Sequence, residues 1–331
     1  MIVIVSREVL DDRNAWLHLD AIVDLFPMGR HQWDLPPDLD YRNLAWLSES
    51  PAHYRTKRNI EIYEKAFTAA AYSAPSNRHA LSVVLTLAPR AVGELTPKDA
   101  EACLREPGRL LVENDESDAA FVEAMVEAHG ATDLWYAFQN DWLVFDHAGG
   151  GGNIPRRLRD LASRHPGPPR FMALTESDRQ TPSSPNSRAA EEVLTCAQEL
   201  QCQAVVLRKR ETENYLPDEA LHLLNAHRPH RPRLRAFQKL SEAQRDHFDM
   251  KRGFRVEAET DEVRLTDDEE TVFSGLSPSD RRALSGGFGK EVWKLFQRSP
   301  RPFTAESIGR RCATTGSDEI PTMLECLRRL L

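Results

Sequence analysis

The sequence has few cysteines, no long apolar run and no excess of positive charge, and each absence excludes a class of protein. Its five cysteines are scattered and form no Cys-x-x-Cys pair, so their spacing excludes a zinc ribbon. An odd number of scattered thiols suits a reducing cytoplasm better than a disulfide framework. No run approaches the roughly 18 apolar residues that a membrane span needs. The apolar opening is too short for a signal peptide, so we expect a cytoplasmic protein without a membrane segment.

Charge limits the range of partners. Lys and Arg number 43 against 51 Asp and Glu, which gives the 331 residues a formal net charge of -8. The whole surface therefore cannot attract polyanions, and a nucleic acid would need a local basic surface or metal ions at an acidic site. The length allows two or three domains, and a hydrophobic fraction of 40% is ordinary for a globular protein.

The apolar pattern divides the chain into three regions. Residues 1–105 predict an N-terminal α+β region, with strands at 2–5 and 81–87 and helices at 56–72 and 95–104. In residues 106–226, short apolar runs alternate with amphipathic segments. We predict strands at 109–113, 134–138, 142–148, 170–176 and 203–209, and helices at 117–130, 153–164 and 187–201. This alternation indicates an α/β domain with a mostly parallel sheet. Residues 227–331 predict a basic and mainly helical region, with an acidic interruption at 257–270 and a helix-turn-helix-like end.

Acidic residues follow three of the predicted strands. Glu113 ends the first strand, and Asp118 lies in the first turn of the next helix; Glu176 and Asp178 follow 170–176, and Glu211 and Glu213 follow 203–209. The ends of parallel strands meet at one edge of the sheet, so these carboxylates should gather there. Glu211 is the exception: it is more typical of a solvated charge, and Glu213 is the better candidate of the two. Gathered carboxylates need a balancing cation, and oxygen ligands suit Mg²⁺ or Mn²⁺. Two such ions could support displacement at a phosphodiester.

Four short motifs follow one another in a suggestive order: LLVENDESDAAF, GGGGN, LTESD and RKRETENYL. Together they resemble a TOPRIM domain, and more narrowly the TOPRIM nucleases of the OLD (overcoming lysogenization defect) family and related bacterial anti-phage effectors. The resemblance covers about residues 109–218. It implies a Rossmann-like core and a Mg²⁺ or Mn²⁺ site, with two ions, held by Glu113, Asp118, Glu176, Asp178 and Glu213. It also gives Glu113 as a candidate general base.

The chain departs from the family pattern at two positions. Asn114 stands where the family usually has Gly, and Glu176 replaces the usual Asp. These departures leave an active, an altered and a degenerate site open. The OLD-like enzymes also suggest a Lys from outside the TOPRIM core that reaches the phosphate, and Lys251 is the candidate here.

Basic residues outside the acidic clusters are candidates for binding a nucleic-acid backbone. They are Arg208, Arg210, Arg228, Arg231, Arg233, Arg235, Lys251 and Arg252. A solvated basic connector is the alternative for the segment 227–239. The glycine run 149–152 could cradle a phosphate or form a plain turn. GGFGK at 286–290 has the wrong spacing for a P-loop, so we do not expect ATP binding there.

These patterns lead to one expected function and one rival. We expect a metal-dependent nuclease acting on DNA or RNA, working beside an ATPase or sensor protein, with a homodimer also open. The rival is a non-catalytic subunit that keeps the TOPRIM-like fold to bind a partner or nucleic acid. A topoisomerase or primase is disfavoured, because the chain is short and lacks a zinc module.

Overall fold

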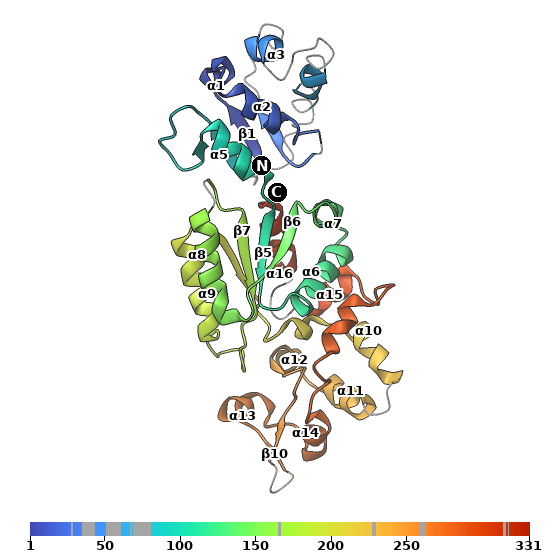
Figure 1. The fold of residues 1–331 in the computed structure, drawn as a ribbon. Helices are drawn as coiled ribbons and strands as arrows, with labels where there is room; N and C mark the ends of the chain where they lie inside the picture. The colour runs from blue at the N-terminus through green and yellow to red at the C-terminus, as the bar shows by residue number, and fades with distance from the viewer. Residues whose placement is uncertain are drawn as a thin grey trace.

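The computed structural model describes residues 1–27, 29–34, 44–50, 61–66, 68, 81–164, 167–226, 230–257, 262–313, 316 and 318–331. The molecule is a mixed α/β protein with two parallel four-stranded sheets. Figure 1 shows the N-terminal sheet at one end, the second sheet in the middle and a group of short helices at the other end. Within the described ranges, no helix combines the length and apolar character that crossing a bilayer requires.

The N-terminal sheet is parallel throughout. Its strands are β1 (Ile2–Val5), β2 (Gln32–Asp34), β3 (Ser82–Leu85) and β4 (Glu94–Leu95), in the order β2-β1-β3-β4. The expected α+β arrangement is therefore wrong, because parallel neighbours need crossover connections, and these carry α1 (Arg7–Asp11), α2 (Trp16–Val23) and α3 (Ala45–Glu49). Residues of this region form their own core, which includes Trp16, Trp33 and Trp46.

The two predictions for the ends of the N-terminal region are confirmed. The strand at 2–5 is β1, and the helix at 95–104 is α5 (Pro97–Arg105). Thr96 caps this helix by accepting the Asp99 N–H, with Pro97 at its first position. Of the helix predicted at 56–72, residues 61–66 are helical and most of the rest lies outside the described residues.

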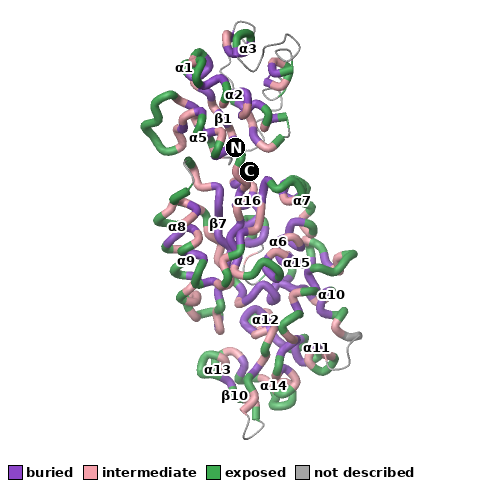
Figure 2. Tube along the Cα trace, viewed as in Figure 1, coloured by how far each residue is buried: buried purple, intermediate pink, exposed green. Residues whose placement is uncertain are grey.

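The second sheet has the order β6-β5-β7-β8, again with every pair parallel. Its strands are β5 (Gly108–Val112), β6 (Leu143–His147), β7 (Phe171–Thr175) and β8 (Gln203–Val206). The helices α8 (Ile154–Arg164) and α9 (Arg188–Glu199) cover one face, while α6 (Ser117–Ala128) packs on the other. Figure 2 shows β7 buried, in agreement with a strand whose five residues are all inaccessible. A strand covered on both faces matches the continuous apolar run in the sequence.

One predicted strand of this region is a helix. Residues 134–138 lie in α7 (Thr132–Gln139). Only Leu134 and Ala137 are buried there, three positions apart, whereas Trp135 and Tyr136 are exposed. The aromatic residues gave the segment a strand-like composition, but the burial follows the helical period.

The C-terminal part consists of short helices and one small hairpin. Its elements are η4 (Thr212–Tyr215), α10 (Asp218–Leu221), η5 (His222–Ala226), α11 (His230–Gln238), α12 (Glu242–His247), β9 (Arg255–Val256), β10 (Val263–Arg264), α13 (Asp267–Phe273), α14 (Pro278–Leu284), η6 (Val292–Gln297), α15 (Ala305–Arg311) and α16 (Glu319–Arg328). The predicted pair of helices within 303–331 is confirmed as α15 and α16. The acidic interruption is partly helical, because four acids from Asp267 to Glu270 form the first turn of α13, where the helix dipole favours them. The C-terminal helices share a core with β5 and α6.

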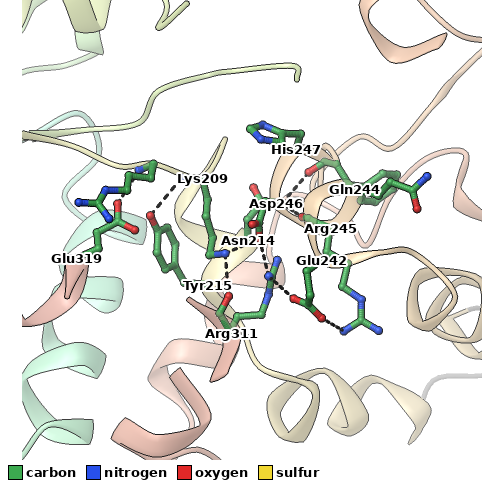
Figure 3. A network of polar contacts seen from close by, with 12 residues as sticks. Lys209, Asn214, Tyr215, Glu242, Gln244, Arg245, Asp246, His247, Arg311 and Glu319 are labelled. Atoms are coloured by element: carbon green, nitrogen blue, oxygen red, sulfur yellow. Dashed lines mark hydrogen bonds and ion pairs between the residues drawn. The ribbon is translucent and has the colours of Figure 1, made fainter. Parts of the chain in front are cut away.

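A buried ionic network ties the segment after β8 to the C-terminal helices (Figure 3). The ammonium group of Lys209 is inaccessible; it pairs with Asp246 of α12 and donates to the Arg311 carbonyl at 2.9 Å. Arg311 Nη1 lies 2.5 Å from Asp246 Oδ1 and 2.9 Å from Glu242 Oε2. Removing one member of such a buried network leaves an uncompensated charge, so the network holds one arrangement. The segment that it fixes carries Glu211 and Glu213.

Candidate metal and phosphate site

The first wall of the site is the loop between β5 and α6. Asn114 shapes it, because its side-chain oxygen accepts the N–H groups of Glu116 (2.9 Å) and Ser117 (3.2 Å). Asp118 Oδ2 accepts the Asn114 N–H at 3.0 Å, so this carboxylate closes the loop. Glu113, directly after β5, is half-buried and lines the cavity with Asp118. Asp118 is therefore both a first-turn helix acid and a pocket residue.

The glycine turn after β6 packs against Glu113. Gly150 donates its N–H to the Glu113 carbonyl at 3.3 Å. A Cβ on Gly151 would lie 3.0 Å from Glu113 Oε2, so a side chain there would push the carboxylate away. Gly149 and Gly150 have φ values of 72° and 116°, a region that favours glycine. The run thus brings backbone close to the carboxylate, whether or not it also meets a phosphate.

Glu176, directly after β7, forms the second wall. Thr212 donates its N–H (2.8 Å) and its hydroxyl (3.2 Å) to Glu176 Oε1. Glu213 is completely buried in η4, and Thr212 also donates its hydroxyl to Glu213 Oε2 at 3.2 Å. One threonine therefore holds the acids of two strand ends in place.

Lys251 brings a positive charge among these acids from outside the sheet. Its Nζ lies 3.1 Å from Glu213 Oε2 and 3.9 Å from Glu176 Oε1. Its backbone is fixed by the glycine loop 286–289, since Phe288 donates to the Met250 carbonyl (2.8 Å) and Gly289 to the Lys251 carbonyl (3.2 Å). We call the cavity of about 290 Å³ that Glu113, Asp118, Glu176 and Lys251 line the acidic pocket.

Protonation in the acidic pocket is shifted by burial and by charge. Burial raises the pKa of Asp118 to about 6, and the nearby carboxylates of Glu113 and Glu213 add to the shift. Burial likewise raises the pKa of Glu176 well above its ordinary value, although Lys251 opposes this. Burial disfavours the charged form of Lys251, but the surrounding glutamates outweigh it and raise the pKa of Lys251. The lysine therefore keeps its proton.

One of the predicted metal ligands lies apart from this group. Asp178 is exposed and lines a separate cavity of about 410 Å³. Its φ of 54° turns the chain, and its N–H donates to the Arg210 carbonyl at 3.1 Å. The prediction that Glu211 is a solvated charge is wrong, because Glu211 is buried near Lys251, and burial raises the pKa of Glu211 to about 7. The acidic pocket thus combines Glu113, Asp118, Glu176 and Lys251, with Glu213 and Glu211 behind it.

The donor atoms fit a hard divalent cation. Three carboxylate side chains from two segments line one polar cavity, and such ligands suit Mg²⁺ or Mn²⁺. Glu211 Oε2 and Glu213 Oε1 are buried without a hydrogen-bond partner among the described residues, a costly state that a cation would relieve. As the side chains stand, no three His, Cys, Asp or Glu residues in the described ranges are grouped to hold an ion. Lys251 supplies the positive charge in this arrangement.

The predicted basic residues lie in different surroundings. Arg208 pairs with Asp318 at 3.3 Å, and Arg210 with Asp249 at 3.2 Å, so both tie segments of the fold together. Arg231, Arg233 and Arg235 lie on α11, and Arg252 is exposed beside Lys251. Arg228 lies outside the described residues.

Sequence reasoning missed His147. It is the last residue of β6, and it lines the acidic pocket with its Nδ1 accepting the Gly149 N–H at 3.3 Å. Its signal in the sequence is its place at the end of an apolar run, directly before the glycines.

Comparisons with known proteins found no match to this chain. No protein-family model, no curated protein and no solved structure matches the chain.

Proposed function

We propose that the chain is a divalent-metal-dependent nuclease with a TOPRIM-type core, hydrolysing phosphodiester bonds of DNA or RNA in the cytoplasm. The observation that carries the proposal is the meeting of Glu113, Asp118, Glu176 and Lys251 in one polar cavity. Strand-end acids of a parallel sheet are where an α/β fold places its ligand site. The order of the motifs between 109 and 218, which resembles the OLD-type nucleases, supports the same reading.

Each residue of the acidic pocket has a role in this proposal. Glu113, Asp118, Glu176 and Glu213 would hold the ions, and Glu113 would also accept a proton. When bound, Mg²⁺ or Mn²⁺ would supply charge that polarises the phosphodiester and stabilises the oxygens that enter and leave. Lys251 presents a protonated Nζ to the cavity, where it can bind a non-bridging phosphate oxygen and orient the strand.

Metal-linked stabilisation tests the proposal directly. Mn²⁺ or Mg²⁺ should raise the melting temperature of the purified full chain, because a ligand bound only to the folded state stabilises it by about 2.7 kcal/mol at a hundred times its Kd. Glu113→Gln should abolish this rise. With Mn²⁺, the wild-type chain should cleave at least one of plasmid, linear duplex, single-stranded DNA and tRNA, and Glu113→Gln should cleave none.

Glu116→Gln is the matched control, because it makes the same chemical change on an exposed residue of the same loop. It should keep both the metal response and the cleavage. A wild-type chain without either response would contradict the proposal.

The resemblance also suggests the setting of the activity. We propose an effector of bacterial anti-phage defence that works with a separate ATPase or sensor protein, since we expect no ATP site in this chain. The amide groups of the glycine loop 286–289 support this: Gly287, Phe288 and Gly289 all donate to backbone carbonyls, so none of the three remains for a nucleotide phosphate.

A non-catalytic TOPRIM-like subunit is the alternative. The ion pair between Lys251 and Glu213 favours it, because a lysine already balances part of the acidic charge. A chain of this kind would bind its partner or nucleic acid without any metal-linked rise in melting temperature.

A further inference from the structure

A second cavity is lined in part by the glycine loop whose amide groups bond to the backbone of Met250 and Lys251. It has a volume of about 480 Å³ and is formed by α11, the glycine loop and η6. Its charged wall carries Arg233, Lys290, Lys294 and Arg298, and we call it the basic pocket. Phe288, Val292 and Leu295 contribute its apolar surface.

The charge of the basic pocket is out of keeping with the rest of the chain. Four cationic side chains face one carboxylate, Glu291, in a protein whose formal net charge is -8. Glu291 is already paired with Lys294 at 2.7 Å. No ion pair or hydrogen bond joins Arg233, Lys290 or Arg298 to any residue that the structure describes. Like charges held close together repel, so an anion would stabilise this wall.

One backbone hydrogen bond connects the basic pocket to the acidic pocket. Gly289 lines the basic pocket, and its N–H donates at 3.2 Å to the carbonyl of Lys251, whose side chain lines the acidic pocket. The next residue, Lys290, carries one of the free charges. A ligand held by Lys290 would therefore lie against the segment that positions Lys251.

The chemistry favours a nucleic-acid backbone over a free nucleotide. Phe288 is only 4% exposed and packs edge-on against Phe237, so it offers no open ring face for a base. The loop amides that could cradle a triphosphate are already donated within the fold. Separate cations can each contact a phosphodiester of a backbone without any stacking of bases.

We propose that the basic pocket binds the phosphodiester backbone of a single nucleic-acid strand, next to the acidic pocket. That this strand is a substrate rests on the proposed nuclease function, whereas the binding itself does not.

The experiment measures binding of a short labelled single-stranded oligonucleotide to the full chain by fluorescence anisotropy, in EDTA. The test variant is Lys290→Gln with Arg298→Gln, two exposed side chains whose replacement should leave the fold intact. The control is Arg159→Gln with Arg164→Gln, an equal change of charge on α8. The test variant should bind at least about tenfold more weakly, and the slope of its affinity against salt should fall by about 1.4. The control should stay within about twofold of the wild type.

Other outcomes distinguish this proposal from alternative explanations. Equal weakening by both double variants would reject the pocket in favour of general electrostatics. Binding of a labelled nucleoside triphosphate that needs Lys290 and Arg298, with strand binding unchanged, would reassign the pocket to a free nucleotide. Strand binding that depends on these residues, without any metal-linked stabilisation, would support the binding role of the basic pocket and contradict the proposed nuclease function. If the Lys290→Gln, Arg298→Gln variant cleaves and binds the strand as well as the wild type does, the binding role of the basic pocket is contradicted, while the proposed nuclease function is not.

Discussion

Lys251 is the residue on which the charge balance of the acidic pocket depends. Lys251→Met should lower the free energy of unfolding by about 3 kcal/mol, because the inaccessible carboxylate of Glu213 then has no cationic partner. Chemical denaturation followed by circular dichroism measures this loss.

Arg252→Met is the natural comparison for that variant. The two residues are adjacent, but Arg252 is exposed, so its replacement should change the stability by no more than about 0.5 kcal/mol. If Lys251→Met is as stable as Arg252→Met, the lysine does not neutralise the acidic pocket.

Single residues also show where sequence reasoning reaches the site and where it stops. Glu113 and Glu176 could be predicted, because strand ends in a parallel sheet converge whatever the details of the loops. Asp178 follows Glu176 by two positions, as a same-side neighbour would in an extended strand. The positive φ at Asp178 turns it into another cavity, and no sequence pattern announces that turn. Lys290 belongs to the GGFGK motif, whose spacing excludes a P-loop and does not predict the cavity that the lysine lines.

At the scale of elements, the glycine loop between α14 and η6 fixes the segment that carries Lys251. A Cβ on Gly287 would lie 2.7 Å from the Gly253 nitrogen and 2.7 Å from the Lys251 carbonyl carbon. Both atoms are backbone, and the φ of Gly287 is +57°, so a side chain forces the two loops apart. Gly287→Ala should therefore cost about 2 to 4 kcal/mol and weaken any activity that needs Lys251.

Gly275 provides the contrast, because it lies between α13 and α14 with no atom within 4 Å of its added Cβ and no positive φ. Gly275→Ala should be neutral or stabilise the chain by up to about 1 kcal/mol. Thermal melts of the two variants, with an activity or strand-binding assay, make the comparison. Equal stability of the two would show that the loops do not depend on this close approach.

The elements themselves were predictable where burial and period agree. The strands β5 and β7 are largely buried apolar runs, and α5 carries its own cap and its own Pro at the first turn. The prediction failed at α7, where exposed Trp135 and Tyr136 imitate a strand. It also failed on the sheet near the N-terminus, because parallel pairing is a property of the connections and not of the strands.

At the scale of the whole molecule, the two four-stranded sheets have the same strand order. In each sheet the second strand in sequence lies at the edge beside the first, followed by the third and fourth. Figure 1 shows the two sheets in succession along the molecule. The acidic pocket lies at the end of the second sheet, where it is built by Glu113 and Glu176 and completed by Lys251. The site is thus a property of particular residues placed on a topology, and the topology alone does not create it.

A buried arginine joins the second sheet to helix α5 and to the C-terminal segment. Arg170, at the start of β7, donates to the Leu330 carbonyl at 3.1 Å and to the Cys103 carbonyl at 3.1 Å. Burial lowers the pKa of Arg170 to about 10, but it remains charged at neutral pH. Helix α5, the second sheet and the C-terminal segment therefore meet at one guanidinium group.

His31, close to that arginine, makes the stability of the N-terminal sheet dependent on pH. Its ring is buried, with Nε2 donating to the Leu104 carbonyl at 2.8 Å. Burial lowers its pKa well below 6.5, and the Met1 amino group, Arg170 and Arg30 add to the shift. Below about pH 6.5 the His31 ring takes up a proton in the unfolded chain but stays neutral in the folded chain. The free energy of unfolding therefore falls as the pH drops. The loss between pH 6.5 and 5 should be about 1.5 kcal/mol from this residue.

Replacing His31 isolates its share of the acid response. His31→Gln keeps a donor for the Leu104 carbonyl but cannot take up a proton, so its stability should fall less steeply below pH 6.5 than that of the wild type. Denaturation followed by tryptophan fluorescence is the appropriate measurement, because Trp16, Trp33 and Trp46 all lie in the N-terminal core. The absolute stability of the variant is not decisive, since a glutamine will pack less well than the ring at any pH. Parallel curves for the two proteins would mean that acid acts on the N-terminal sheet through other groups.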